Sequence, residues 1–419
     1  MITKKIVFFV MVDVPTFQIN QKELQNIVGF IHNKERVLKK YGAIKIQPNI
    51  QCKFALKKKP KKLVLHPITK RIAKVNSNNL IYSVRNISRN DKVNEQTAVI
   101  SDECSPWSDL SSYLNNDQRQ LNISYSLNST FFLKKMAQVN FDIHRIPKMS
   151  LLRLAGKEII SECVPCVKRA HGIGAIFPLS CTEQHLFSLD YHHEGGIHHW
   201  YIIPNDKREA LSRLINKEDS SICLDHGQIV IDPLFLDKHH IRYHRIKQCP
   251  NEFVVLSADA LSQSFAEDAS WSESIVFALP SWVEEGHASK PSSSCQCDIF
   301  NRSLSKTIDD TVFSKEMIQQ YIKSYLDNNT NDKSIILKDQ NYSSVMTTST
   351  MDDMQSSSCN DEPIIPSNVK LMFSSQQVVP SHDSASNVST TSLISNFLNE
   401  DGKYESDINN GQFQYQVLE

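Results

Sequence analysis

The chain has 419 residues, which is enough for one large domain or two to three smaller ones with a substantial apolar core. Its 46 lysines and arginines balance 46 aspartates and glutamates, which excludes a net charge that would draw the whole protein to nucleic acid or membrane. No segment approaches the roughly 18 apolar residues of a membrane span. The apolar run at 6–12 lacks a signal-peptide cleavage site, so we expect a buried strand there and a soluble, intracellular protein.

Residues 13–55 begin with a predicted helix. Asn20 is placed to cap it, and Glu23 occupies the reciprocal position of a capping box. Apolar residues then recur at helical spacing until Gly42, which is followed by a short extended piece at 43–48. Because the segment is too small to form a core of its own, we expect it to pack on the rest of the chain.

Residues 56–120 are predicted to hold linker strands followed by a polar connector. Strand-like apolar runs occur at 63–68 and 80–84, and the composition from 88 onward turns to Asn, Asp and Ser. The basic run 57–62 is typical of signals read by nuclear import receptors, and a solvated loop accounts for it equally well.

Residues 121–330 contain the strand-rich core. Predicted strands at 186–191 and 197–204 are joined by Glu194-Gly195-Gly196, a sequence typical of a hairpin. Helices are predicted at 206–214 and 317–326. The tail 331–419 is rich in Ser, Asn, Asp, Gln and Thr, and we expect it to be disordered because it cannot bury enough apolar surface to offset the entropy of ordering.

Several motifs resemble the JmjC domain of histone lysine demethylases. They are Gly195-Gly196-Ile197-His198-His199-Trp200-Tyr201-Ile202-Ile203-Pro204, then Glu252-Phe253-Val254-Val255, Glu273-Ser274, Phe277-Ala278 and Trp282. Pro15-Thr16-Phe17 and Gly42-Ala43-Ile44-Lys45-Ile46-Gln47-Pro48 resemble a JmjN segment. The resemblance implies an α+β fold, in which a double-stranded β-helix, or jelly roll, carries flanking helices and an N-terminal JmjN segment.

The iron ligands that the resemblance implies are missing. Such enzymes hold Fe(II) with a His-x-Asp/Glu pair and a distant His. Counted without gaps, the pair falls on Ser180 and Thr182, and the distant His falls on Ser262. Hydroxyls bind Fe(II) weakly at neutral pH. A one-residue deletion before Leu186 would place Cys181 and Glu183 at the pair instead, which keeps a carboxylate without either imidazole.

The positions that bind 2-oxoglutarate in the family are altered too. The family's lysine corresponds to His198, its asparagine to Asp190 and its tyrosine to Phe132. Replacement of a permanent cation by His, together with an added anion, disfavours a dicarboxylate ligand. We therefore expect neither Fe(II) nor 2-oxoglutarate to bind in the ordinary way.

A second metal site resembles the structural zinc site of one JmjN/JmjC subfamily. Cys295-Gln296-Cys297 follows the jelly roll, and Cys223 and His226 lie in an earlier loop. Two thiolates, a third thiolate and an imidazole complete a tetrahedral zinc site. The spacing from Cys223 to His226 is shorter than in the family, which makes the cysteine the less secure ligand.

Other possible ligands are weaker. Adjacent histidines on a strand face opposite sides, so a metal site built from His193 or His199 competes with histidines that are simply hydrogen-bonded. Cys163 and Cys166 have the spacing of half a zinc site, but no second pair lies near them in the sequence.

Three functional hypotheses remain. The first is a catalytically inactive JmjN/JmjC pseudoenzyme in the nucleus, where it binds zinc and a histone tail or another chromatin protein. The second is an active Fe(II)- and 2-oxoglutarate-dependent histone lysine demethylase, a dioxygenase with non-standard iron ligands. The third is a decaying gene copy. No membrane association and no direct sequence-specific DNA binding are evident in the sequence.

Overall fold

The computed structural model describes residues 13–50, 52, 54, 56–57, 63–68, 70–75, 80–86, 119–133, 141–290, 297 and 307–326. The predicted strand at 6–12, most of the basic run and of the connector from 88, and the tail from 331 lie outside these residues. These predictions therefore stay predictions. Within the described residues, no helix is both long and apolar enough to cross a membrane.

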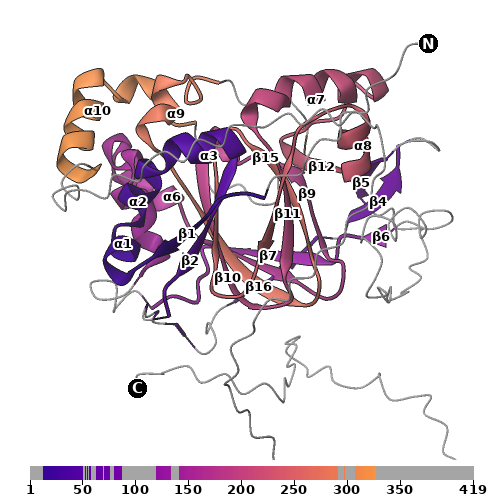
Figure 1. Ribbon diagram of the computed structural model, residues 1–419, viewed down its shortest axis with the longest axis horizontal. Helices are drawn as coiled ribbons and strands as arrows, with labels where there is room; N and C mark the ends of the chain where they lie inside the picture. The colour runs from indigo at the N-terminus through magenta and orange to yellow at the C-terminus, as the bar shows by residue number, and fades with distance from the viewer. Residues whose placement is uncertain are drawn as a thin grey trace, which may run out of the picture. The chain divides into compact units, whose positions relative to one another are not determined.

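Two β-sheets form the centre of the fold (Figure 1). In the described part of the chain, sheet one has the strand order β1 (Thr16–Ile19), β2 (Ala43–Pro48), β14 (Phe253–Leu256), β10 (Phe187–Gly195), β16 (Ser270–Phe277), β8 (Cys166–Ala170), β7 (Ile123–Leu127) and β3 (His66–Pro67). Sheet two has the order β13 (His244–Gln248), β11 (His198–Ile203), β15 (Leu261–Ala266), β9 (Ile176–Ser180), β12 (His226–Ile231), β5 (Ile81–Asn86), β4 (Lys70–Lys74) and β6 (Arg119–Gln120).

The chain passes repeatedly from one sheet to the other. From β8 to β11 successive strands alternate between sheet one and sheet two, and the same happens from β13 to β16. The pairings are antiparallel throughout, apart from β1 with β2. This is the two-sheet jelly roll with flanking helices that the sequence predicted, because antiparallel strands that alternate between facing sheets enclose a common interior.

The predicted hairpin at 194–196 is wrong. Strand β10 pairs with β14 and β16 in sheet one, whereas β11 pairs with β13 and β15 in sheet two, so these residues form a crossover. Gly195 has φ +102°, and a Cβ there would lie 2.0 Å from the carbonyl oxygen of Ala269. The glycine therefore serves a close backbone approach and not a two-residue turn.

The N-terminal segment is built into the same fold. The capping box of Asn20 and Glu23 is present, with both reciprocal hydrogen bonds formed. The predicted single helix is divided into α1 (Gln21–Gln25), α2 (Ile27–Asn33) and α3 (Glu35–Tyr41), because Asn26 and Lys34 have non-helical angles. Strand β2 then pairs with β14 of the central sheet.

The remaining helices lie around the two sheets. They are α5 (Ile146–Met149), α6 (Lys157–Glu162), α7 (Asn205–Glu218), α8 (Pro233–Lys238), α9 (Pro280–Glu284) and α10 (Lys315–Tyr321). The 3-10 turns are Ile143–Arg145, Leu151–Ala155, Glu183–His185 and Asp310–Val312, and Ile322–Leu326 is a π-helix.

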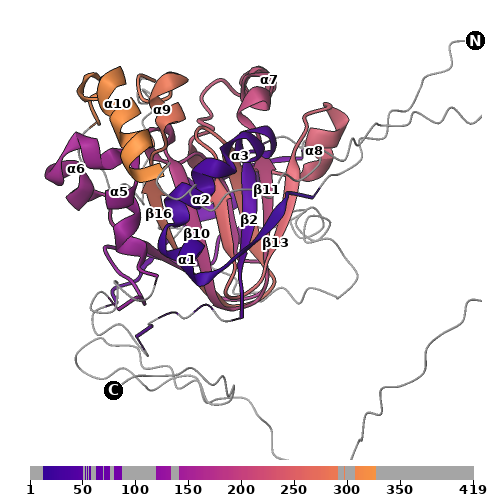
Figure 2. The same ribbon diagram turned by 60° about the vertical axis from the view of Figure 1, so that its left-hand side comes forward.

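Two large apolar clusters stabilise the sheets. In the first, Leu24 and Ile27 of the N-terminal helices pack with Leu189 and Phe253 of sheet one. Figure 2 shows α1, α2 and α3 lying in front of β2 and β10. The second cluster joins α7 and α8 to sheet two and also includes Ile123 of β7 and Ala170 of β8 in sheet one. Apolar packing therefore extends from one sheet to the other at β7 and β8.

Candidate functional site

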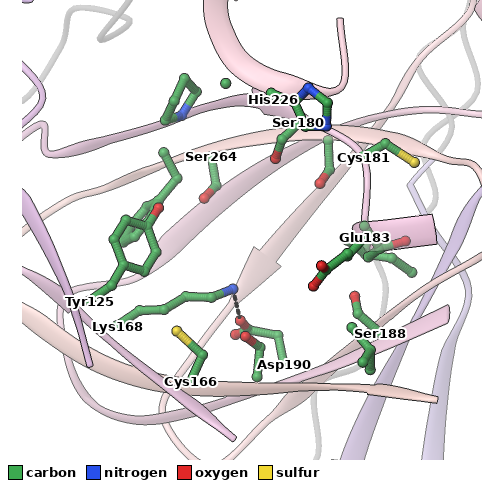
Figure 3. Close-up of a pocket in the computed structure, with 18 of the residues that line it drawn as sticks. Tyr125, Cys166, Lys168, Ser180, Cys181, Glu183, Ser188, Asp190, His226 and Ser264 are labelled. Carbon is green, nitrogen blue, oxygen red and sulfur yellow. Dashed lines mark hydrogen bonds and ion pairs between the residues drawn. The ribbon is translucent and has the colours of Figure 1, made fainter. Parts of the chain in front are cut away.

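A cavity of about 420 Å³ lies between the two sheets. Lys168 on β8 and Asp190 on β10 line it from sheet one, and Ser180 on β9 and Ser264 on β15 line it from sheet two. Figure 3 shows these four side chains converging from opposite walls. A volume of this size accommodates a small organic ligand.

The three positions predicted to lack iron ligands all line this cavity. Ser180 and Ser262 are direct cross-strand partners on β9 and β15, and Thr182 follows just beyond β9. The hydroxyl of Thr182 donates a hydrogen bond to the carbonyl of Leu186 and so is already engaged. Three hydroxyls do not match the imidazole and carboxylate donors of a non-haem Fe(II) site. Ordinary iron binding does not suit these residues.

The alternative ligands Cys181 and Glu183 do not form such a site either. Glu183 and Cys181 both line the cavity, but the thiol of Cys181 is engaged with His185, whose Nδ1 lies 3.5 Å away. Asp259, which is fully buried, approaches the same nitrogen at 2.7 Å, and the three ligand atoms lie within 4.8 Å of one another. The spacing of these three ligand atoms resembles that of a metal site. The neighbouring charges therefore determine whether a metal ion or an ion-pair network is favoured here.

Those charges favour an ion-pair network over a bound metal. Asp259 also pairs with Arg208 at 2.9 Å and with Lys290. Burial opposes the charged imidazole, but its hydrogen bonds to Asp259 and Cys181 outweigh this effect and raise the pKa of His185 to about 9. Burial likewise opposes the Asp259 carboxylate, yet its bond with His185 and the charge of Arg208 hold its pKa well below the usual range. A metal would have to displace a proton and approach two fixed cations.

Two of the three altered 2-oxoglutarate positions line the cavity. His198 is stacked on His192 with ring centroids 4.5 Å apart, and its Nε2 is hydrogen-bonded to Ser270. Burial and the nearby His192 and Lys168 lower the pKa of His198 well below its ordinary value, so the ring is neutral. Its position offers no permanent positive charge for a dicarboxylate. Asp190 also lines the cavity and has a carboxylate where the family has an amide.

Phe132 is not among the residues that line the cavity. It lies in an aromatic cluster, with ring centroids 5.1 Å from Phe141, 5.4 Å from Tyr191 and 5.4 Å from His193. The correspondence between this phenylalanine and the family's tyrosine stays a prediction.

Sequence reasoning missed Lys168, a lysine of the cavity wall that pairs with Asp190. Its Nζ lies 2.7 Å from Oδ2 of Asp190. The two residues are 22 positions apart and meet because β8 and β10 both pair with β16. The only signal in the sequence was a lysine inside a strand-like run, which is also typical of an exposed strand face.

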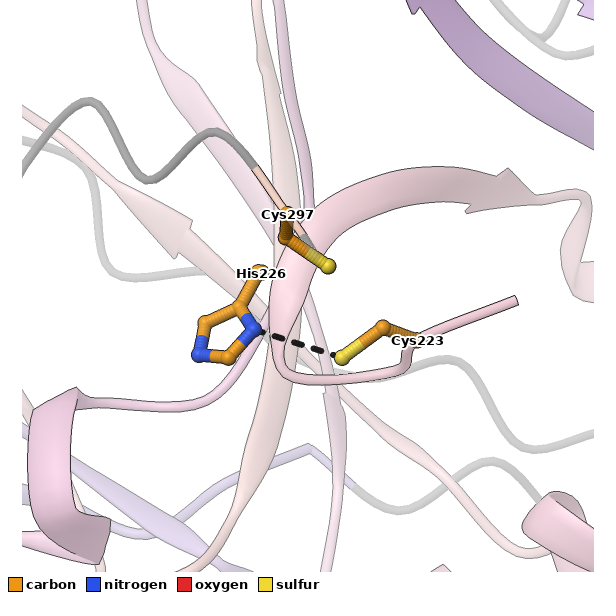
Figure 4. A group of neighbouring side chains, drawn as sticks. All are labelled: Cys223, His226 and Cys297. Carbon is orange, nitrogen blue, oxygen red and sulfur yellow. Dashed lines mark hydrogen bonds between the residues drawn. The ribbon is translucent and has the colours of Figure 1, made fainter. Parts of the chain in front are cut away.

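The predicted zinc ligands come together in part. Cys223, His226 and Cys297 have ligand atoms within 4.8 Å of one another, and the Cys223 thiol lies 3.3 Å from Nδ1 of His226 (Figure 4). Cys295 lies outside the described residues. The shortened spacing between Cys223 and His226 is accommodated, because the loop turns directly into β12. Two thiols and one imidazole suit a tetrahedral zinc ion with one further ligand.

The competing ligands have other partners. His193 forms a buried pair with Glu273 at 3.0 Å, and His199 pairs with Glu267 at 2.5 Å. Cys163 and Cys166 are buried, which raises the pKa of each thiol to about 12, and neither belongs to a metal-binding group within the described residues. Thiols with raised pKa values are poor metal ligands.

Two family models match parts of the chain. Residues 172–277 match the family described as JmjC domain, hydroxylase. Residues 11–150 match the Ribophorin II N-terminal domain. The structure places strands of that second range in both sheets, since β2 pairs with β14 and β5 with β12. The described strands of the N-terminal range therefore belong to the same sheets as the strands of the JmjC match.

Curated relatives point in the same direction. Over 127 residues the chain is 31% identical to Probable lysine-specific demethylase 4F of Homo sapiens, 28% to Lysine-specific demethylase 4B of Mus musculus and 30% to Lysine-specific demethylase 4D of Rattus norvegicus. Each alignment covers 29% of this chain and 19%, 11% and 24% of the respective relatives. The chain thus spans less than a quarter of their lengths, and the similarity to these demethylases is confined to a 127-residue region.

Proposed function

Since residues 172–277 form a JmjC domain, we propose that the chain is a catalytically inactive relative of the histone lysine demethylases. One observation carries the proposal. Ser180, Thr182 and Ser262 face the interior of the jelly roll at the positions that the resemblance assigns to iron ligands, and none of them offers an imidazole or a carboxylate. The domain then acts as a scaffold or a binding module.

Zinc is the metal that we propose for this protein. Cys223, His226 and Cys297 would supply three ligands, and Cys295 would supply the fourth. The ion would fasten the segment after the jelly roll to the start of β12, which stabilises the domain without taking part in chemistry. Residues 13–55 would serve as the JmjN segment, a role that agrees with the pairing of β2 and β14.

Metal content and turnover test the proposal directly. The full chain is purified without chelator and incubated anaerobically with Fe(II), and bound metals are then measured together with 2-oxoglutarate decarboxylation. We expect about one equivalent of zinc, no iron and no turnover. Iron that is retained by the chain and lost on Glu183→Ala would instead support an active enzyme with non-standard ligands.

A gain-of-ligand variant serves as the matched control. The triple change Ser180→His, Thr182→Glu and Ser262→His supplies a His-x-Glu pair at the end of β9 and a distant His on β15. If the positional assignment is right, this variant binds iron whereas the parent does not. Failure of the folded variant to bind iron would show that the jelly roll does not place its iron positions as proposed.

Nuclear location and a histone tail or chromatin partner are part of the proposal. They are supported by the demethylase relatives and by the basic run 57–62. Fractionation of cells that produce the tagged chain, followed by binding to histone peptides, tests them. Recovery in the cytosol alone, without peptide binding, would contradict this part.

A further inference from the structure

Strands β8, β10 and β16 present a polar surface to the cavity that is separate from the iron positions. Lys168 lies directly opposite Ser272, and Asp190 lies directly opposite Ser274. All four side chains line the cavity. Side chains alternate across a strand, so residues two apart lie on the same face of the sheet. The face that bears these four residues therefore points to the interior. Lys168 and Asp190 form its ion pair.

This ion pair is incompletely satisfied. Oδ2 of Asp190 accepts from Lys168, but Oδ1 has no hydrogen-bond partner among the residues that the structure describes, although Asp190 is 1% exposed. The hydroxyl oxygen of Ser272, also 1% exposed, has no partner among these residues either. A buried polar atom without a partner costs about 1–3 kcal/mol. Two such atoms at the wall of one cavity mark a place where a ligand donates hydrogen bonds.

The opposite wall supplies hydroxyl groups. Ser180 and Ser264 point into the cavity from sheet two in Figure 3, and Ser262 lines it beside them. Aromatic rings of Tyr125 and Trp200 also contribute to the walls. Hydroxyls both donate and accept, so this side can bind either charged end of a small molecule.

Both signs of charge line the cavity. The lining contains three positive side chains and three negative ones, Lys70, Lys168, Lys290, Glu183, Asp190 and Asp225, together with His185, which is paired with Asp259. A dicarboxylate would add negative charge beside Asp190, and a simple cation would be repelled by Lys168. A ligand that carries a positive and a negative group close together can place the positive group near Asp190 and the negative group near Lys168, and so avoids both repulsions.

We propose that the cavity binds a small zwitterion of the α-amino acid type. Its ammonium group would donate to Oδ1 of Asp190 and to the hydroxyl of Ser272. Its carboxylate would accept from Lys168 and from the hydroxyls of Ser180 and Ser264. The side chain of the ligand would occupy the remaining volume of the cavity. This assignment does not depend on whether the protein is an enzyme, because it uses none of the iron positions as metal ligands.

Calorimetric titration of the full chain with single amino acids tests the proposal. The probes are glycine, alanine, serine and leucine, and the comparison compounds are glycine betaine, which has no N–H donor, succinate, 2-oxoglutarate and glucose. We expect saturable binding of at least one amino acid and none of the comparison compounds. Preference for succinate, 2-oxoglutarate or glucose, or no binding by any amino acid, would overturn the proposal.

Variants locate the site. Asp190→Asn and Lys168→Met should each weaken binding about 10- to 100-fold, because each removes a charge-assisted hydrogen bond. The double variant, with both Asp190→Asn and Lys168→Met, removes both charges together. It leaves no unpaired buried ion and is therefore expected to stay folded. Glu194→Gln, on the exposed end of the same strand, is the matched control and should bind as the parent does. Unchanged binding in the folded double variant would refute the site.

Discussion

Among the residues that form ion pairs in this protein, Asp259 is the one whose substitution should lower the free energy of unfolding most. It is fully buried and contacts His185, Arg208 and Lys290. Asp259→Ala leaves His185 and Arg208 without this carboxylate in a poorly solvated place, whereas Lys290 is partly exposed and can be hydrated. Loss of one partner from a buried ion pair typically costs about 3–5 kcal/mol. At about 2 °C per kcal/mol for a domain of this size, the midpoint of thermal unfolding should fall by about 6–10 °C.

The effect should depend on pH with a defined sign. The pKa of His185 is raised to about 9, above its unfolded value, so its contribution is complete below about pH 6.5 and is lost as the pH rises through 9. The lowered pKa of Asp259 gives a contribution that is present above about pH 4 and is lost in acid. The difference between parent and variant should therefore be largest near pH 5–6. Because Arg208 keeps its charge, part of it should persist at pH 10.

Thermal unfolding followed by tryptophan fluorescence at pH 5.5, 7.5 and 10 measures the effect. Glu209→Ala is the matched control, since Glu209 pairs with Arg213 on the exposed surface of α7, where loss of a pair should be barely measurable. A loss below about 1 kcal/mol for Asp259→Ala at pH 5.5, or a loss that does not change with pH, would refute the reasoning about this network.

Two further predictions concern the metal cluster and the crossover. Cys297→Ser and His226→Ala should each reduce bound zinc from about one equivalent toward zero, as measured by elemental analysis, whereas Cys249→Ser should retain it; retained zinc in the first two variants would place the metal elsewhere. Gly195→Ala should destabilise the fold by about 2–4 kcal/mol in chemical unfolding, because the added methyl group meets backbone at a positive φ. Gly172→Ala, whose methyl group would make only an ordinary 3.7 Å contact, should change stability by less than about 0.5 kcal/mol, and equal losses at the two glycines would contradict the steric argument.

Local signals in the sequence predicted local structure well. The capping box of Asn20 and Glu23 is formed, and the strand motifs around Trp200 and Phe253 become β11 and β14. Each depends on neighbouring residues or on an alternating apolar pattern. The hairpin predicted from Glu194-Gly195-Gly196 is absent because such glycines occur both in hairpins and in close crossovers between sheets. Only the pairing of the flanking strands distinguishes the two.

The interior of the site was beyond local reasoning. Asp190 was singled out, but its partner Lys168 was not, because strand pairing through β16 brings them together. Asp259 likewise gives no signal in the sequence, since its partners are 31 to 74 residues away along the chain. Cys223 and His226 were found because metal ligands are few in kind and closely spaced. Metal ligands can thus be predicted from the sequence more readily than the partners of buried ion pairs.

The polar groups of the cavity lower the stability of the fold and at the same time allow it to bind a ligand. Substitution of a buried ion pair by well-packed apolar residues is often neutral or stabilising by about 1–4 kcal/mol. The cavity nevertheless keeps Lys168 and Asp190, together with a carboxylate oxygen and a Ser272 hydroxyl that lack partners in the described part of the chain. The two large apolar clusters supply the burial that offsets this cost. A ligand present at about 100 times its dissociation constant would return about 2.7 kcal/mol to the folded state. Occupancy of the cavity would then act on the whole jelly roll, because the strands that bear the ion pair also pair with the strands that carry the core.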